Sequence, residues 1–313
     1  MMRAARFGGV NAAALTPMRP DLTVDLDRMA AHCRWLLANG CTGLAVLGTT
    51  GEANSLGLEE RLAVIEGLVA RGIPTARMLP GCGTPAIPDT VMLTRRAGAL
   101  GCPGVLLLPP FFYKNPSDEG LFAYFSEVIQ RTGGTPSVYL YHFPQQSAVP
   151  FGLDLIARLL AAYPGVIAGI KDSSADLANT LAYVEHFAAD GFEVYCGDDG
   201  ALQRLLKAGG AGCITAVSNV AAFLAARICA DPVAPAADAA QATLASVRRA
   251  ITAGPLIPGL KALLARHSGL AGWASVRPPH LPLAPEAAAR LFAAFDACGV
   301  ALPPLSGEAA GPG

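Results

Sequence analysis

The segment GVIAGIKDSS, residues 165–174, ends an apolar run in a lysine. Residues 166–170 are apolar, Lys171 follows directly, and Asp172 comes next. A lysine is almost never fully buried unless it has a partner or a chemical task. Desolvation disfavours the ammonium form of the side chain, which frees the amine to attack a carbonyl carbon. A purely structural alternative is an ion pair between Lys171 and Asp172 at the end of a strand.

Two further polar features follow other apolar runs. Tyr141 closes one of them, and its phenol can pass protons between the lysine, a carbinolamine and a substrate hydroxyl. The turn GTTGE, residues 48–52, offers the hydroxyls of Thr49 and Thr50 and backbone N–H groups, which can hold a carboxylate. Each feature alone also fits a packed tyrosine or a capped tight turn, and we expect Glu52 to support the turn rather than contact a substrate. Together with the lysine they favour Schiff-base formation with a 2-oxo acid.

These groups need a scaffold that brings strand ends together, and the chain shows a repeated pattern that supplies one. Three segments, 36–50, 97–110 and 205–217, each contain a helix end, a glycine, a second glycine and a short apolar run. Such runs are typical of strands buried on both faces. The pattern predicts strands at Val10–Leu15, Gly43–Leu47, Met78–Gly81, Gly104–Leu108, Ser137–Tyr141, Ile167–Lys171, Glu193–Cys196 and Gly212–Ala216.

Helical segments separate these eight strands, the clearest being Asp25–Asn39, Asp118–Gln130, Leu153–Tyr163, Leu177–Ala188 and Gly200–Ala208. Eight strand–helix units predict an α/β fold of the (β/α)8 TIM-barrel type with a C-terminal helical extension. A doubly wound sheet is the alternative, but ALTPMRP stands where its dinucleotide-binding glycine fingerprint would follow the first strand. In a TIM barrel the chemistry sits where the strands end, which is where the polar groups fall.

The domain organisation follows from where the strand pattern stops. We expect residues 1–228 to form the barrel and residues 229–300 a helical domain with helices near 236–252, 257–268 and 285–298. Residues 301–313, rich in Pro, Gly and Ala, are expected to be a disordered tail.

Composition limits the classes of function. The chain has 313 residues, 52% hydrophobic and 15% charged, and a net charge of −1, which leaves no basic face for nucleic acid. No apolar stretch reaches the length of a membrane span, and the N-terminus does not read as a signal peptide. The eight cysteines form no C-x-x-C pair, which indicates reduced thiols in a cytoplasmic protein. The five histidines show no metal-ligand spacing.

At the level of motifs the sequence resembles the dihydrodipicolinate synthase / N-acetylneuraminate lyase superfamily of pyruvate-dependent class I aldolases. The matching motifs occur in order over most of the chain: ALTP (14–17), GTTGE (48–52), PP (109–110), Y-x-x-P (141–144), GIKDSS (169–174), GDD (197–199) and GGAGCITAVSNV (209–220). The resemblance implies a barrel with C-terminal helices, a homotetramer or homodimer, and a covalent imine with no metal or organic cofactor.

The resemblance also implies roles for individual residues. Lys171 would form the Schiff base and Tyr141 would relay protons in contact with Thr49. The hydroxyls of Thr49 and Thr50 would bind the 2-oxo acid carboxylate. Gly197 and Ile214 would line the site around the imine. In many members an aromatic residue after the fourth strand completes the relay across a subunit interface, and Tyr113 is the hydroxyl-bearing aromatic in that loop here.

One departure from the family pattern bears on the second substrate. Gln146 stands at or near the position where dihydrodipicolinate synthases carry an arginine that grips the carboxylate of aspartate semialdehyde. A neutral amide cannot replace a bidentate guanidinium. The loop also differs from the sialic-acid lyase pattern. Its amides suit a neutral or polyhydroxylated substrate tail, with Gln146 as a binding residue.

The sequence therefore predicts a lyase that acts on a 2-oxo acid, by aldol cleavage or dehydration of a substrate like a 2-keto-3-deoxy sugar acid. Pyruvate is the expected product of cleavage. The alternatives are condensation of pyruvate with aspartate semialdehyde, deamination of a hydroxylated pyrroline carboxylate by the same imine chemistry, and a non-catalytic binding barrel.

Overall fold

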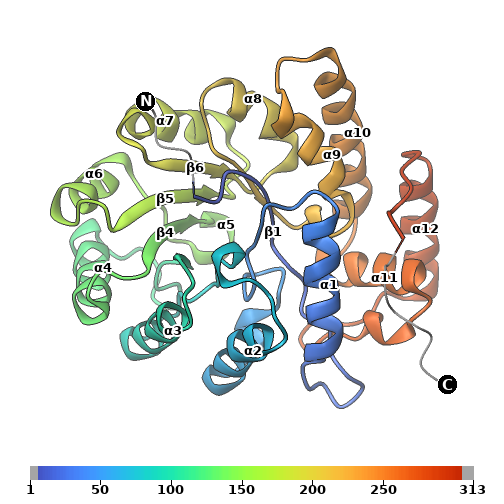
Figure 1. Ribbon diagram of the computed structural model, residues 1–313, viewed down its shortest axis with the longest axis horizontal. Coiled ribbons are helices and arrows are strands. Elements are labelled where there is room, and N and C mark those ends of the chain that lie inside the picture. Colours follow the sequence, from blue (N-terminus) through green and yellow to red (C-terminus); the bar gives the residue numbers. More distant parts are fainter. Residues whose placement is uncertain (1–5, 305–313) are drawn as a thin grey trace.

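A parallel sheet curls into a barrel with helices outside it, in the computed structural model, which describes residues 6–304 (Figure 1). Within these residues the sheet has seven strands in the order β2-β1-β7-β6-β5-β4-β3. The strands are β1 Gly9–Ala12, β2 Gly43–Leu44, β3 Gly104–Leu107, β4 Ser137–His142, β5 Ile167–Asp172, β6 Glu193–Cys196 and β7 Gly212–Thr215. The predicted TIM-barrel class with a C-terminal helical extension is confirmed.

The predicted strand at Met78–Gly81 is not a regular strand in the structure, but the segment lies in the barrel wall where a strand was expected. Isolated parallel bridges join Leu44 to Met78 and Gly81 to Leu106, so this segment fills the gap between β2 and β3. Pro80 interrupts the ladder because proline has no N–H to donate. β2 is also shorter than expected. Ala45 and Val46 still make backbone hydrogen bonds to neighbouring segments, and Leu47, with φ 57°, then turns the chain away.

Helices alternate with the strands and cover the outside of the barrel. Through the barrel they are α1 Leu26–Ala38, α2 Leu58–Ala70, α3 Ile87–Ala99, α4 Asp118–Thr132, α5 Pro144–Ser147, α6 Leu153–Ala162, α7 Leu177–Phe187, α8 Leu202–Lys207 and α9 Ser218–Ala230. Local sequence fixes several ends. Ser117 caps α4 by accepting a hydrogen bond from the Gly120 N–H at 3.2 Å, and Gly133 ends that helix with φ 69°.

Two packed regions surround the strands. A small cluster fills the inside of the barrel and consists of Phe7, Ala45, Leu79, Leu106, Tyr139, Tyr141, Tyr195 and Ile214. A much larger cluster lies between the strands and the helices. Side chains of successive strand residues point to opposite faces, so each strand contributes to both regions. This alternation decides which polar residues face a substrate and which face the helices.

The C-terminal helices gather on one side of the barrel, drawn in orange to red in Figure 1. They are α10 Pro235–Thr252, α11 Leu256–Ser268 and α12 Pro285–Asp296. The expected boundary after residue 228 falls inside α9, a helix that the sequence analysis did not predict. The expected tail begins in contact with the body, since the carbonyls of Pro303 and Pro304 accept hydrogen bonds from Trp35. The rest of the expected tail, residues 305–313, lies outside the described residues.

Candidate active site

Lys171 and Tyr141 lie side by side at the inner face of the barrel. They are directly paired neighbours on β5 and β4. Both are buried, with exposed fractions of 5% and 4%. The Lys171 Nζ lies 4.1 Å from the centre of the Tyr141 ring. Each strand runs one residue beyond the predicted end, to Asp172 and His142. The strands thus place an amine and a phenol next to each other.

Apart from its contact with the Tyr141 ring, the amine of Lys171 has no polar partner within the described residues. Among residues 6–304, no carbonyl or carboxylate accepts a hydrogen bond or ion pair from its Nζ. The alternative of an ion pair with Asp172 does not hold, because successive residues of β5 point to opposite faces and Asp172 has other partners. A buried lysine without an acceptor is available for chemistry.

The turn after β2 brings the hydroxyl of Thr49 to Tyr141. The Thr49 Oγ1 and the Tyr141 hydroxyl are 3.4 Å apart, a long hydrogen bond in which either oxygen can donate. Thr50 is buried beside it. The turn is closed by its own backbone and by Thr16, whose hydroxyl donates to the Gly51 carbonyl at 2.7 Å. The contact between Thr49 and Tyr141 that the family resemblance implies is therefore present.

Gly197 and Ile214, which the family resemblance implies as lining residues, lie on and after neighbouring strands of the barrel. Ile214 is fully buried on β7 among the side chains inside the barrel. Gly197 follows β6, and its N–H donates to the Asp172 carbonyl at 2.6 Å. A Cβ at Gly197 would lie 2.0 Å from the Ser173 hydroxyl. The close approach of the loops after β5 and β6 therefore requires a glycine there.

Two predicted residues are not brought to Lys171 within this chain. Tyr113 is 79% exposed, and its ring packs edge-on against Phe112, which is 70% exposed. Gln146 is exposed on α5, whereas its neighbour Gln145 is turned to the Ser174 carbonyl. Neither Tyr113 nor Gln146 makes a side-chain hydrogen bond to another residue in the part of the chain that the structure describes.

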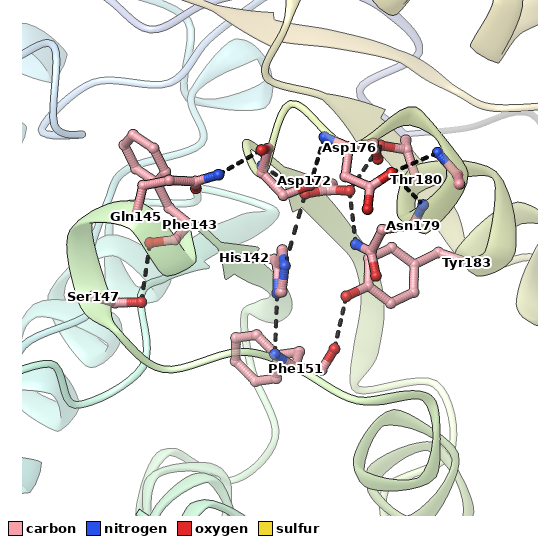
Figure 2. Close-up of polar contacts among 12 residues, drawn as sticks. His142, Phe143, Gln145, Ser147, Phe151, Asp172, Asp176, Asn179, Thr180 and Tyr183 are labelled. Atoms are coloured by element: carbon pink, nitrogen blue, oxygen red, sulfur yellow. Dashed lines mark hydrogen bonds and ion pairs between the residues drawn. The ribbon is translucent and has the colours of Figure 1, made fainter. Parts of the chain in front are cut away.

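Behind the amine and the phenol lies a polar network that sequence reasoning missed (Figure 2). His142 lies between Asp172 and Phe151. The Phe151 N–H donates to the His142 Nδ1 at 3.0 Å, so in the neutral ring the proton is on Nε2, which lies 4.0 Å from an Asp172 oxygen. Burial lowers the pKa of His142, against an opposing effect of Asp172.

The Asp172 carboxylate is the centre of this network. It accepts hydrogen bonds from the Ser174 N–H at 2.8 Å, the Asn179 amide at 2.9 Å and the Thr180 hydroxyl at 2.7 Å. Asn179 and Thr180 belong to α7, so the network joins the end of β5 to the next helix. The signal in the sequence was the polar residue after Lys171, which alternation alone assigns to the outer face.

A second group missed by sequence reasoning stands behind the turn. Lys261 on α11 forms a fully buried ion pair with Glu52, the last residue of GTTGE. Burial lowers the pKa of Lys261, and the Glu52 carboxylate opposes that shift. The expectation that Glu52 supports the turn agrees with this contact. A lone lysine within the apolar segment LIPGLKALL was the available signal.

Other kinds of site were also sought in the described chain. Within residues 6–304, no three His, Cys, Asp or Glu side chains gather where they could hold a metal ion. Across the same residues, no helix is both long and apolar enough to cross a membrane. The eight cysteines are free thiols, and burial raises the pKa of Cys33, Cys41 and Cys82 to about 12.

Comparison with known proteins identifies the family. The profile of the Dihydrodipicolinate synthetase family matches residues 6–297. An uncharacterized DapA-like lyase of Chloroflexus aurantiacus is 36% identical over 292 residues, which cover 92% of this chain and 96% of that protein. The chain belongs to the dihydrodipicolinate synthetase family, and it is an enzyme of the class I aldolase and lyase type.

Solved structures agree with this assignment. The crystal structure of dihydrodipicolinate synthase from Agrobacterium tumefaciens has a TM-score of 0.86 and 32% identity, and the match covers 93% of this chain and 99% of that one. YagE of E. coli K12, a member of the dihydrodipicolinic acid synthase family solved in complex with pyruvate, has a TM-score of 0.85 and 27% identity, over 94% of this chain and 99% of that one.

Proposed function

We propose that this member of the family cleaves or dehydrates a 2-keto-3-deoxy sugar acid through an imine on Lys171. The observation that carries the proposal is the pairing of a buried, acceptor-free Lys171 Nζ with the Tyr141 ring at 4.1 Å. Thr49 and Thr50 bind the substrate carboxylate, while Gly197 and Ile214 bound the space around the imine. A relative solved with pyruvate supports a 2-oxo acid at this site.

The chemistry needs only groups of the chain and the substrate. The Lys171 amine attacks the 2-oxo carbon, water leaves, and a protonated imine forms. In aldol cleavage the bond between C3 and C4 breaks, its electron pair moves into the imine to give an enamine, and Tyr141 takes the proton of the C4 hydroxyl. An aldehyde leaves, the enamine is protonated at C3, and water releases pyruvate from the lysine. In dehydration C3 instead loses a proton to give the enamine, and the C4–O bond then breaks. The hydroxyl takes a proton from Tyr141 and leaves as water, a C3–C4 double bond forms, and water releases the unsaturated 2-oxo acid from the lysine. No metal or organic cofactor takes part in either route.

The neutral loop after β4 supports a sugar acid over aspartate semialdehyde. Gln146 is exposed on α5 and carries no charge to pair with a second carboxylate. Synthesis of dihydrodipicolinate is nevertheless a second candidate, because synthases of that pathway are among the relatives, including one from Bacillus subtilis at 33% identity over 215 residues. A coupled assay with pyruvate and aspartate semialdehyde separates the two. Deamination of a hydroxylated pyrroline carboxylate would use the same imine and is tested by ammonia release.

We also propose that the chain works as a homotetramer or homodimer in the cytoplasm. The exposed pair of Phe112 and Tyr113 supports an assembly that covers this loop, because large aromatic side chains gain free energy when they leave water. In such an assembly Tyr113 of one subunit would complete the relay of its neighbour. Free, buried thiols fit a reducing compartment.

Borohydride trapping tests the imine. Treatment of the protein with pyruvate and borohydride is expected to add one reduced pyruvate unit to Lys171, found by peptide mass spectrometry. Lys171→Met is expected to give no adduct and to lose at least about 10³-fold in activity. The proposal would be overturned if the protein without the substitution gave no adduct, or gave the adduct on another lysine.

The same preparation identifies the reaction. A panel of 2-keto-3-deoxy sugar acids is screened for release of pyruvate and, in parallel, for a new 2-oxo product without pyruvate. Pyruvate release identifies aldol cleavage, and the second outcome identifies dehydration. If the protein turned over no sugar acid of the panel but condensed pyruvate with aspartate semialdehyde, the synthase reaction would replace this proposal.

A further inference from the structure

The turn that carries Thr49 and Thr50 is bracketed by unusual backbone. Leu47 has φ 57° and Glu52 has φ 55°, both in the left-handed region. Residues with a Cβ rarely adopt this conformation, since the side chain crowds the backbone. Such conformations persist only where the surroundings hold them. The contacts of Glu52 show what holds this one.

The carboxylate of Glu52 is held from the C-terminal helices. Lys261 Nζ donates to one of its oxygens, and both side chains are 0% exposed. The same Nζ donates to the Ser275 carbonyl at 2.8 Å. The other oxygen of Glu52 accepts from the Arg277 N–H at 2.9 Å. The turn is therefore anchored to α11 and to the segment 275–277, more than 200 residues away in sequence.

The side chain of Arg277 fixes the same region to the start of α2. Its guanidinium donates to both carboxylate oxygens of Glu60 at 2.8 Å. It also donates to the Ser55 carbonyl at 2.7 Å and the Leu22 carbonyl at 2.6 Å. The segment that follows the turn is therefore tied to Arg277 at Ser55 and at Glu60.

We propose that Lys261, with the segment 275–277 that it holds, is a positioning residue that sets the turn 48–52 for binding the substrate carboxylate. This inference rests on the proposed function, and it adds a role for the C-terminal helices. A buried charge whose partner is removed is strongly unfavourable in place, so the Glu52 carboxylate must move or take up a proton. Either change releases the left-handed residue and shifts Thr49 and Thr50. Lys171 and Tyr141, on other strands, stay where they are.

The test separates affinity from the covalent step. In Lys261→Met, the pyruvate concentration that gives half-maximal borohydride adduct is expected to rise at least about 10-fold. At saturating pyruvate, the amount of adduct on Lys171 is expected to reach that of the protein without the substitution. A merely structural role for Lys261 would instead lower the thermal midpoint and leave half-saturation of the folded protein unchanged, which would overturn the proposal.

Two control variants match Lys261→Met. Arg266 lies on the same helix and pairs with Asp296 at the surface, so Arg266→Met should leave half-saturation unchanged. Leu244 is fully buried on α10, and Leu244→Ala loosens the C-terminal helices without removing a partner of Glu52. The proposal fails if Leu244→Ala raises half-saturation as much as Lys261→Met does. In the double variant Glu52→Gln/Lys261→Met, the thermal midpoint should recover while half-saturation stays raised.

A second readout does not depend on the imine. The Glu52 N–H donates to the Thr49 carbonyl at 3.1 Å and the Ala53 N–H to the Gly48 carbonyl at 3.2 Å. Hydrogen exchange at these two amides should be faster in Lys261→Met than in Leu244→Ala. Equal exchange would overturn the positioning role even if the adduct forms. If the protein without a substitution forms no adduct, only the proposed imine is overturned. Hydrogen exchange then still tests the positioning role of Lys261.

Discussion

The ends of β4 and β5 present two faces with opposite character. On the inner face, the Tyr141 hydroxyl shares one long hydrogen bond with the Thr49 hydroxyl, and the Lys171 amine makes none within the described residues. On the outer face, the next residues along, His142 and Asp172, have acceptors and donors that are nearly all used. Adjacent residues of the same strands thus differ completely in how they are bonded.

This difference follows from what each face must do. A group that is to react needs a polar atom that is not already held by a hydrogen bond, whereas the strand that carries it needs a fixed position. Asp172 joins the end of β5 to α7 through Asn179 and Thr180, and His142 joins the end of β4 to the segment at Phe151. We therefore expect changes on the inner face to affect chemistry with little loss of stability, and changes on the outer face to do the reverse.

The largest effect is expected on the inner face. Tyr141→Phe removes the proton relay and keeps the ring, so kcat should fall by about 10²–10³-fold. The thermal midpoint should stay near that of the unmodified protein because the hydroxyl has only a 3.4 Å contact with Thr49. Steady-state kinetics and calorimetry measure the two. If Tyr141→Phe lowered the thermal midpoint and left kcat unchanged, the inner face would be structural and the expectation would be wrong.

The next effect concerns the outer face. Asp172→Ala leaves the Ser174 N–H, the Asn179 amide and the Thr180 hydroxyl without their acceptor, and should cost about 3 kcal/mol of unfolding free energy. Urea unfolding measures this loss. Asp176→Ala serves as the matched control: it removes only the cap of α7 and should cost about 1 kcal/mol. Equal losses would mean that the network is no more than a helix cap.

The smallest effect is a dependence on pH. Because burial lowers the pKa of His142 in the folded state, the unfolded chain binds a proton at higher pH than the folded one does. The stabilisation is present above about pH 6.5, the unfolded value, and is lost as the pH falls below it. Protonation at Nδ1 would also remove the bond from the Phe151 N–H.

Urea unfolding on both sides of that pH, with His142→Gln for comparison, checks this dependence. His142→Gln should lose less stability on acidification than the unmodified protein. His32, whose pKa burial lowers to about 4, titrates in the same direction and is present in both proteins, so the difference between them isolates His142. Parallel pH profiles would show that His142 does not take up a proton on unfolding.

Much of the fold was predictable because local chemistry and periodicity agree along the chain. Buried runs between glycines gave the strands, and their ends gave Lys171, Tyr141 and the GTTGE turn. The errors have physical causes. Pro80 has the apolar neighbours of a strand but cannot continue the ladder. The helix α9 was not predicted because its Ala-rich sequence lacks a strong apolar stripe.

The supporting contacts were less predictable than the reactive groups. Lys261 and Glu52 are 209 positions apart, and periodicity says nothing about which distant charge meets which. His142 and Asp172 could be placed on the outer face by alternation, but their partners depend on how α7 packs. The environment of Tyr113 depends on whatever covers that surface, and a single chain does not contain it.

The buried ion pair between Glu52 and Lys261 restricts how this architecture can vary. Recombination that exchanged α10 to α12 could cut at residues 231–234, between α9 and α10, but it would remove the partner that the turn 48–52 has on α11. The barrel and its helical appendage are therefore expected to descend as one inherited unit. New substrate specificities are then expected to arise in the loops after β3 and β4, whose sequences can change without disturbing the contact between Glu52 and Lys261.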